Sequence, residues 1–168
     1  RTMAQNLKSV VETLEKSNYE LAKRNRANMF VTVWMGFVVL KTGHVEFASA
    51  GHNPPVIRHK DGSVGFAKSK AGIVLAAMEN SRYKLQTLDL APGDTLFLYT
   101  DGVTEATNVH EELFGNDRLL EALAQGGGRG TAGTCRFVKR QIDAFTKNAS
   151  QFDDITMLAM DYKGGNGL

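Results

Sequence analysis

Short apolar runs bounded by turn residues fill the chain between residues 30 and 100, and this pattern restricts the fold more than any other feature. The run Phe30–Leu40 is rich in β-branched and aromatic residues, which is typical of a buried strand. Comparable runs follow at Val45–Ala50, Val56–His59, Tyr83–Leu90 and Thr95–Thr100, the last two joined by a Pro-Gly turn at Ala91–Asp94. The sequence therefore predicts consecutive antiparallel strands, of which the first two form a hairpin.

Helical periodicity occurs only before and after this series. Residues 1–26 carry apolar side chains at three- and four-residue steps, which predicts an amphipathic helix. Two further helices are predicted at Asp117–Leu123 and Thr131–Thr146, and Asp154–Asp161 is predicted to be the last strand. Because strands and helices are segregated along the chain, the pattern favours the α+β class over an alternating doubly wound fold.

The composition excludes several classes of protein. A chain of 168 residues with 42% hydrophobic residues can bury a core, which rules out intrinsic disorder and a disulfide-stapled mini-protein. The net charge of +2 gives no argument for a nucleic-acid partner or for membrane contact, and neither is expected. The single cysteine, Cys135, can form no internal disulfide, which indicates a reducing compartment and a cytoplasmic location. The glycine-rich residues 163–168 are predicted to form a flexible tail.

The most informative polar motif is Tyr99–Ala106, with the sequence YTDGVTEA. Asp101 follows a predicted buried strand, so its carboxylate would be held rigidly at the end of that strand. Gly102 lets the backbone turn sharply and leaves room for a ligand. An ordinary Asp-Gly turn explains these residues equally well, so the motif alone leaves both interpretations open.

Two adjacent carboxylates, Asp153 and Asp154, precede the last predicted strand. Neighbouring like charges are unfavourable unless a cation neutralises them, and Mg²⁺ and Mn²⁺ prefer such oxygen ligands. A solvated turn is the alternative. In a third motif, Ala50–Pro55 (AGHNPP), the turn residues predict a rigid loop in which His52 more often has a structural than a catalytic role.

Other motifs that could indicate a binding or catalytic site are either absent or not supported by the predicted elements around them. The segment Gly128–Gly133 fits G-x-G-x-x-G, but it follows a predicted helix rather than a strand, so a helix–helix connector explains it better. The histidines show no metal-ligand spacing, and neither a P-loop lysine motif nor a G-x-S-x-G elbow occurs. Cys135 lies on the apolar face of a predicted helix and is expected to be a core residue.

Together these motifs resemble the bacterial sporulation-type and stress-response-type (SpoIIE-like) serine phosphatases of the metal-dependent protein phosphatase superfamily, which are protein phosphatase 2C-like. The matching segments occur in the family's order: Met29–Thr32, Ala50–Pro55, Pro92–Asp94, Tyr99–Ala106, Phe114–Gly115, Arg118–Leu119 and Asp153–Thr156. The resemblance implies an α-β-β-α sandwich of two antiparallel sheets flanked by helices.

The resemblance also implies an activity, the hydrolysis of phosphoserine or phosphothreonine on a regulatory protein, typically an anti-sigma-factor antagonist. Two ions, Mn²⁺ or Mg²⁺, would share a bridging hydroxide that acts as the nucleophile, so no catalytic side chain is expected. Asp101 and Asp153 correspond to metal-binding aspartates of the family. The residues expected to lie beside these ligands and to orient them or bound waters are Asp154, Gly102, Glu105, Asn108, His52 and Asn53. Whether the domain forms a homodimer is left open.

The sequence departs from the family's pattern in its front section. The Gly-Gly-Asp and Asp-Val-Ser-Gly-type segments, which complete the two-metal site in the family, do not occur in the 168 residues. We therefore expect residues 1–168 to form a single, N-terminally truncated domain that corresponds to the rear portion of the catalytic domain. The alternative to an enzyme is a non-catalytic, partner-binding pseudophosphatase domain with an incomplete metal site.

Overall fold

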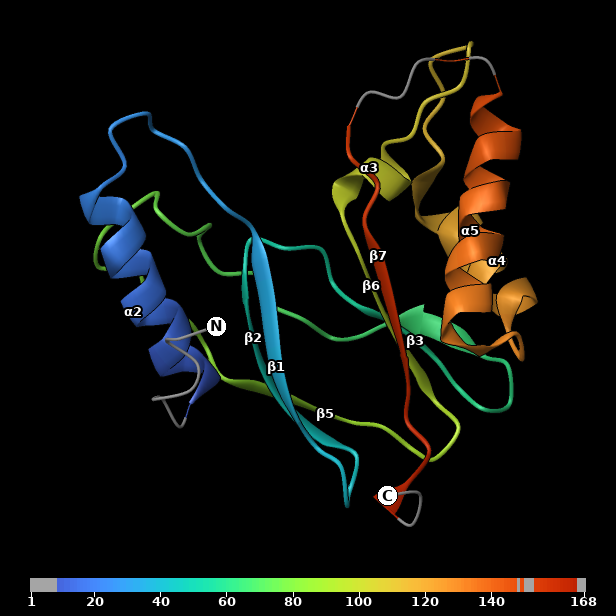
Figure 1. Ribbon diagram of the computed structural model, residues 1–168, viewed down its shortest axis with the longest axis horizontal. Helices are drawn as coiled ribbons and strands as arrows, with labels where there is room; N and C mark the ends of the chain where they lie inside the picture. The colour runs from blue at the N-terminus through green and yellow to red at the C-terminus, as the bar shows by residue number, and fades with distance from the viewer. Residues whose placement is uncertain (1–8, 148, 150–152, 166–168) are drawn as a thin grey trace. The chain divides into compact units, whose positions relative to one another are not determined.

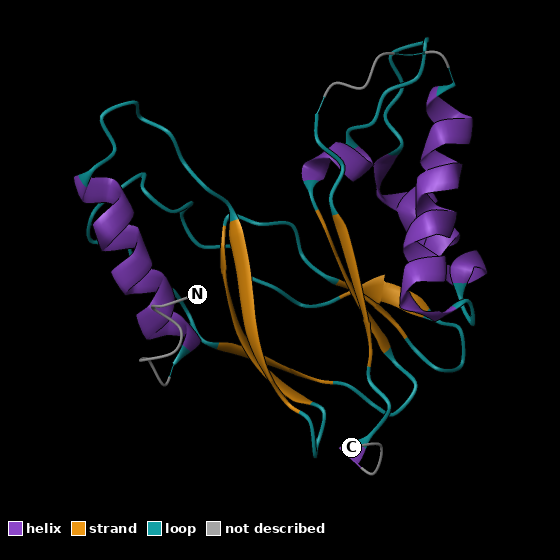
Figure 2. Cartoon of the chain, viewed as in Figure 1, coloured by secondary structure: helices purple, strands orange, loops and turns teal. Residues whose placement is uncertain are grey.

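The computed structural model describes residues 9–147, 149 and 153–165 of the chain (Figures 1 and 2). By its internal contacts the chain divides into two compact units. The first unit comprises Arg1–Pro54 and Lys68–Asp89, and the second comprises Pro55–Ala67 and Leu90–Leu168. The expectation that residues 1–168 form a single domain stays a prediction.

The first unit contains helix α2 (Val10–Lys23) and a three-stranded antiparallel sheet. The strand order is β1 (Val33–Val39), β2 (His44–Ala50) and β5 (Gln86–Asp89). Leu14 of α2 packs with Ala48 and Ala50 of the central strand β2, together with Leu75 and Tyr83. The amphipathic pattern of α2 therefore serves to cover this sheet.

The β1–β2 hairpin predicted from the sequence is confirmed. Val39 pairs with His44 at its closed end, and Val33 pairs with Ala50 at its open end. Gly43 completes the turn with a φ of 79°, a left-handed conformation that glycine adopts without steric cost.

The second unit contains a four-stranded antiparallel sheet in the order β4-β3-β6-β7. Its elements are β3 (Val56–Arg58), β4 (Val64–Phe66), β6 (Thr95–Tyr99), α3 (Asp101–Thr104), α4 (Gly115–Gly126), α5 (Gly130–Thr146) and β7 (Met157–Asp161). Helices α4 and α5 lie together on one side of this sheet (Figure 1). The core between the sheet and these two helices includes Phe97 of β6, Leu119 and Leu123 of α4, and Val138 and Ile142 of α5.

The α+β class and the two antiparallel sheets predicted from the sequence are confirmed. The strands predicted on either side of the Ala91–Asp94 turn exist, but β5 and β6 belong to different sheets and do not pair. Strand β4 was not predicted, and the chain after β6 forms the short helix α3 rather than a simple turn. The stacking of the two sheets as a sandwich stays a prediction.

Both ends of the chain extend beyond the described residues. The predicted N-terminal helix ends at Lys23, and residues 1–8 lie outside the described part. Of the predicted tail, residues 166–168 lie outside it. Within the described part, no helix combines the length and the apolar character that a membrane span requires.

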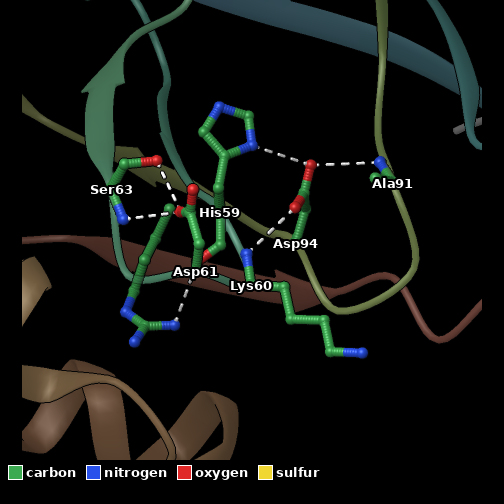
Figure 3. A network of polar contacts seen from close by, with 7 residues as sticks. His59, Lys60, Asp61, Ser63, Ala91 and Asp94 are labelled. Carbon is green, nitrogen blue, oxygen red and sulfur yellow. Dashed lines mark hydrogen bonds and ion pairs between the residues drawn. The ribbon is translucent and has the colours of Figure 1, made fainter.

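A buried carboxylate holds the turn that leads into β6 (Figure 3). Asp94 is 2% exposed. Its side chain accepts hydrogen bonds from the backbone N–H groups of Ala91 (3.0 Å) and Lys60 (3.3 Å) and lies 3.1 Å from Nδ1 of His59. Its carbonyl oxygen accepts the N–H of Tyr162 at 2.8 Å. Asp94 thereby joins the end of β3, the turn and the residue after β7.

Replacing Asp94 with alanine is expected to lower the free energy of unfolding by about 2 kcal/mol, because buried donors lose their shared acceptor. Urea unfolding monitored by circular dichroism measures this change. The chain offers a matched control, since Asp89 contacts His44 at 2.7 Å but its side chain is 79% exposed. Asp89→Ala is expected to cost less than about 0.5 kcal/mol. Equal losses for the two variants would contradict a special role for the buried carboxylate.

Candidate metal centre

Asp101 lies at the junction between β6 and α3. Strand β6 is largely buried and ends at Tyr99, so the residues that follow it start from a rigid support. Thr100 is the N-cap residue of α3, and Asp101 is the first residue of this helix. The Asp101 side chain is exposed, and its Oδ1 accepts the N–H of Gly102 at 3.1 Å. A carboxylate is thus presented to solvent from the end of a core strand, as the sequence predicted.

The segment that carries the second candidate carboxylate lies against this junction (Figure 1). The hydroxyl of Thr100 donates to the carbonyl oxygen of Asp154 at 2.9 Å and accepts the N–H of Thr156 at 3.0 Å. The backbone N–H of Thr100 donates to the carbonyl of Thr156 at 3.0 Å. Asp153 is exposed, and its Oδ1 accepts the N–H of Asp154 at 2.7 Å. Thr100 therefore fastens the Asp153–Asp154 segment beside Asp101.

Sequence reasoning did not identify Thr100. The signal that could have found it is a small hydroxyl residue directly before a helix start, where such side chains commonly bond to backbone groups. Here the hydroxyl serves a neighbouring segment instead of its own helix, because α3 has no side-chain cap bond.

Gly102 permits the close approach of the two segments. A Cβ atom at this position would lie 2.5 Å from the carbonyl oxygen of Asp154 and 3.0 Å from its carbonyl carbon. The backbone of Asp153 is also near, with its carbonyl carbon 3.4 Å from the same point. Gly102 lies within α3, so what the site requires is the missing side chain rather than a sharp turn.

Glu105 and Asn108 follow in the loop after α3. The exposed Glu105 lines a cavity of about 640 Å³ together with Gly102 and Asp153. The Asn108 side chain bonds within its own loop: its Oδ1 accepts the N–H of Glu112 at 3.1 Å, and its Nδ2 donates to Oε2 of Glu112 at 2.8 Å. The predicted role of Asn108 beside metal ligands stays a prediction.

His52 and Asn53 belong to the first unit. Nδ1 of His52 lies 3.3 Å from the hydroxyl of Thr32, and its carbonyl accepts the Ser49 hydroxyl at 3.2 Å. The second unit contains the remaining predicted site residues, which are Asp101, Gly102, Glu105, Asn108, Asp153 and Asp154. That His52 and Asn53 orient metal ligands stays a prediction.

A protein-family model described as Stage II sporulation protein E (SpoIIE) matches residues 1–163. The chain belongs to the SpoIIE family. Protein IcfG of Synechocystis sp. is 32% identical to this SpoIIE-family chain over 144 residues, which cover 86% of the chain and 22% of IcfG. Phosphoserine phosphatase RsbU of Bacillus subtilis is 28% identical over 94 residues, which cover 56% of the chain and 28% of RsbU. The SpoIIE-family chain thus spans only a minor part of these relatives.

Solved structures give the fold of the SpoIIE-family chain. The SiaA-PP2C domain of Pseudomonas aeruginosa superposes with a TM-score of 0.81 at 20% identity, over 95% of this chain and 63% of that one. The phosphatase domain of SpoIIE from Bacillus subtilis, presoaked with Mn, superposes with a TM-score of 0.66 at 15% identity, over 96% and 70% of the two chains. The resemblance to the SpoIIE-like family is confirmed by the family model, and these structures share the α+β fold with two antiparallel sheets.

The side chains of this site in the SpoIIE-family chain could supply part of the ligands of a divalent metal ion. Asp101 and Asp153 supply carboxylate oxygens, the ligands that Mg²⁺ and Mn²⁺ prefer, from two segments that are held together. However, no group of three or more histidine, cysteine, aspartate or glutamate side chains within the described residues could hold an ion. The carboxylates therefore fit as a partial ligand set, to which water or other groups would have to be added.

Cys135 is not an alternative nucleophile in the SpoIIE-family chain. Its side chain is half-buried and packs against the core of the second unit, which confirms the position predicted from the sequence. Burial raises the pKa of the Cys135 thiol above its usual value. Because the thiolate is the reactive form, this residue is held in its unreactive state at neutral pH.

Proposed function

We propose that this domain hydrolyses phosphoserine or phosphothreonine on a regulatory protein, with Mn²⁺ or Mg²⁺ as its cofactor. The observation that carries the proposal is that, in a SpoIIE-family domain, the segments of Asp101 and Asp153 lie side by side. The Thr100 hydroxyl bonds one segment to the other, and Gly102 permits their close approach. Two divalent ions, when bound, supply Lewis acidity and lower the pKa of a coordinated water.

Each residue of the site has a role that follows from its position. Asp101 and Asp153 would hold the ions through their carboxylates, which offset part of the positive charge. Thr100 keeps the two carboxylate-bearing segments in register, since its hydroxyl bonds to the backbone on both sides of Ile155. Glu105, which lies one helical turn after Asp101, would orient ligands or waters at the edge of the cavity.

The substrate and the setting of the reaction belong to the same proposal. RsbU, one of the relatives, carries the name phosphoserine phosphatase, which favours phosphoserine as the residue that is dephosphorylated. An anti-sigma-factor antagonist is the substrate class that the resemblance implies. The near-neutral net charge of +2 supports a protein partner rather than nucleic acid or a membrane, and the single cysteine supports a cytoplasmic setting.

A non-catalytic regulatory domain is the second candidate. The observation in its favour is that the described residues bring only a partial set of metal-binding side chains together. In that case the same surface would bind a phosphoprotein partner without hydrolysing it.

Mn²⁺ titration calorimetry on the 168-residue chain, combined with phosphate release from a phosphoserine peptide, separates the two candidates. Binding of about two ions per chain together with turnover is the result expected for a phosphatase. Weak Mn²⁺ binding without turnover would overturn the proposal for this chain, which would then hold only the rear part of a phosphatase site or act as the non-catalytic domain. A chromogenic aryl phosphate, measured in parallel, reports chemistry that does not depend on peptide recognition.

A further inference from the structure

A second cavity in the second unit, of about 520 Å³, is rich in positive charge. The charged residues that line it are Arg58, Lys60, Lys163 and Asp161. We name it the basic cavity. Thr95, the first residue of β6, also lines it, whereas Asp101 follows the last residue of the same strand. The basic cavity and the candidate metal centre are therefore at opposite ends of β6.

The basic cavity has three cationic side chains and one acidic side chain in its lining. Within the described residues, no ion pair involves Arg58, Lys60 or Lys163. Asp161, the acidic lining residue, accepts the Thr95 hydroxyl at 2.8 Å. Positive charge in this cavity thus exceeds negative charge, which favours an anionic ligand.

Arg58 has unused hydrogen-bonding capacity. Its Nε is buried and has no hydrogen-bond partner among the described residues. Its Nη1 makes only a long contact, 3.5 Å, with the carbonyl oxygen of His59. A guanidinium normally satisfies its donors when it is buried, and a planar oxyanion or phosphate matches its geometry.

The backbone around the basic cavity is held in place before any ligand binds. Asp94 accepts the N–H of Lys60 at 3.3 Å, and Figure 3 shows the Lys60 side chain extending away from that carboxylate. On the other side, the Arg58 guanidinium lies directly against Gly127, in space that a Cβ atom at this position would occupy. Such preorganisation reduces the entropic cost of binding.

We propose that the basic cavity binds a small phosphate-bearing anion with two or more negative charges. Cations from β3, from the turn after it and from the segment after β7 converge on one space, and each can form charge-assisted hydrogen bonds to phosphate oxygens. The N-terminus of α5, whose Gly130 lines the cavity, adds positive potential through the helix dipole, and no acidic residue in its first turn reduces that potential. This site is independent of the proposed phosphatase activity.

Calorimetric titration of pyrophosphate into the 168-residue chain tests the proposal. The buffer contains EDTA, so that no metal ion can mediate binding at Asp101 and Asp153. Lys60→Gln and Lys163→Gln are each expected to weaken binding by about tenfold, since each removes one charge-assisted contact. Both lysines are exposed, so neither variant removes a core side chain. The matched control is Lys41→Gln, an exposed lysine of the first unit, which is expected to leave binding unchanged.

Two results would overturn the proposal. One is the absence of binding at millimolar pyrophosphate. The other is an equal loss of affinity in Lys41→Gln, which would indicate general charge attraction rather than a site. Inorganic phosphate and ATP, titrated in separate arms, distinguish the source of the phosphate group. Tighter binding of ATP than of pyrophosphate would assign a nucleotide, and comparable binding of inorganic phosphate would assign the free ion.

Discussion

Asp101→Asn is expected to reduce Mn²⁺-dependent hydrolysis of a phosphoserine peptide by about a thousandfold, because it removes several kcal/mol of metal-ion catalysis. The amide keeps the size of the side chain but loses the negative charge that holds the cation. Mn²⁺ affinity, measured by calorimetry, is expected to fall together with the rate. Because Asp101 is exposed, the free energy of unfolding without metal is expected to change little.

The control for this variant is Asp117→Asn, the same change at an exposed residue in the first turn of α4. It is expected to leave turnover and Mn²⁺ affinity unchanged. Undiminished turnover of Asp101→Asn at saturating Mn²⁺ would show that Asp101 is not a metal ligand.

Gly102→Ala is the second variant with a large expected effect. A methyl group at this position meets the backbone carbonyl of Asp154 at 2.5 Å, and a backbone atom cannot move away as a flexible side chain can. We expect a loss of about 3 kcal/mol in the free energy of unfolding, at the upper end of the usual cost of overpacking. Chemical denaturation measures it.

The same variant is also expected to weaken Mn²⁺ binding, because it pushes the Asp153–Asp154 segment away from Asp101. Gly65→Ala is its matched control: Gly65 lies in β4, and a Cβ there would meet no atom within 4 Å. That variant is expected to change stability by less than about 0.5 kcal/mol. If Gly102→Ala changed the free energy of unfolding as little as Gly65→Ala does, the close approach of the two segments would be disproved.

The sequence predicted the local features of this protein better than its long-range ones. Period and turn residues located the β1–β2 hairpin and the buried run before Asp101, because these signals depend on neighbouring residues. The separation of β5 and β6 into different sheets was not predictable, since a Pro-Gly turn such as Ala91–Asp94 does not itself determine whether its flanking strands pair.

In the candidate site, too, the sequence predicted the individual residues but not the long-range contacts between them. Asp101 and Asp153 could be selected because carboxylates at strand ends are chemically conspicuous. The contacts that unite them could not, because the Thr100 bond to Asp154 and the fit of Gly102 exist only between segments that are distant in the sequence. Residue type alone would have assigned Gly102 to a turn, whereas it lies in α3 against another backbone.

The pairing of β6 with β7 also determines when the site can form during protein synthesis. Tyr99 pairs with Met157, so the two carboxylate-bearing segments meet only after α4, α5 and the start of β7 have left the ribosome. Pairings between such distant segments form slowly, since a long loop must close first. A nascent chain that ends before Asp153 therefore displays Asp101 without its partner carboxylate and leaves one edge of β6 unpaired. Any metal-dependent activity must accordingly appear late, as a property of the completed sheet.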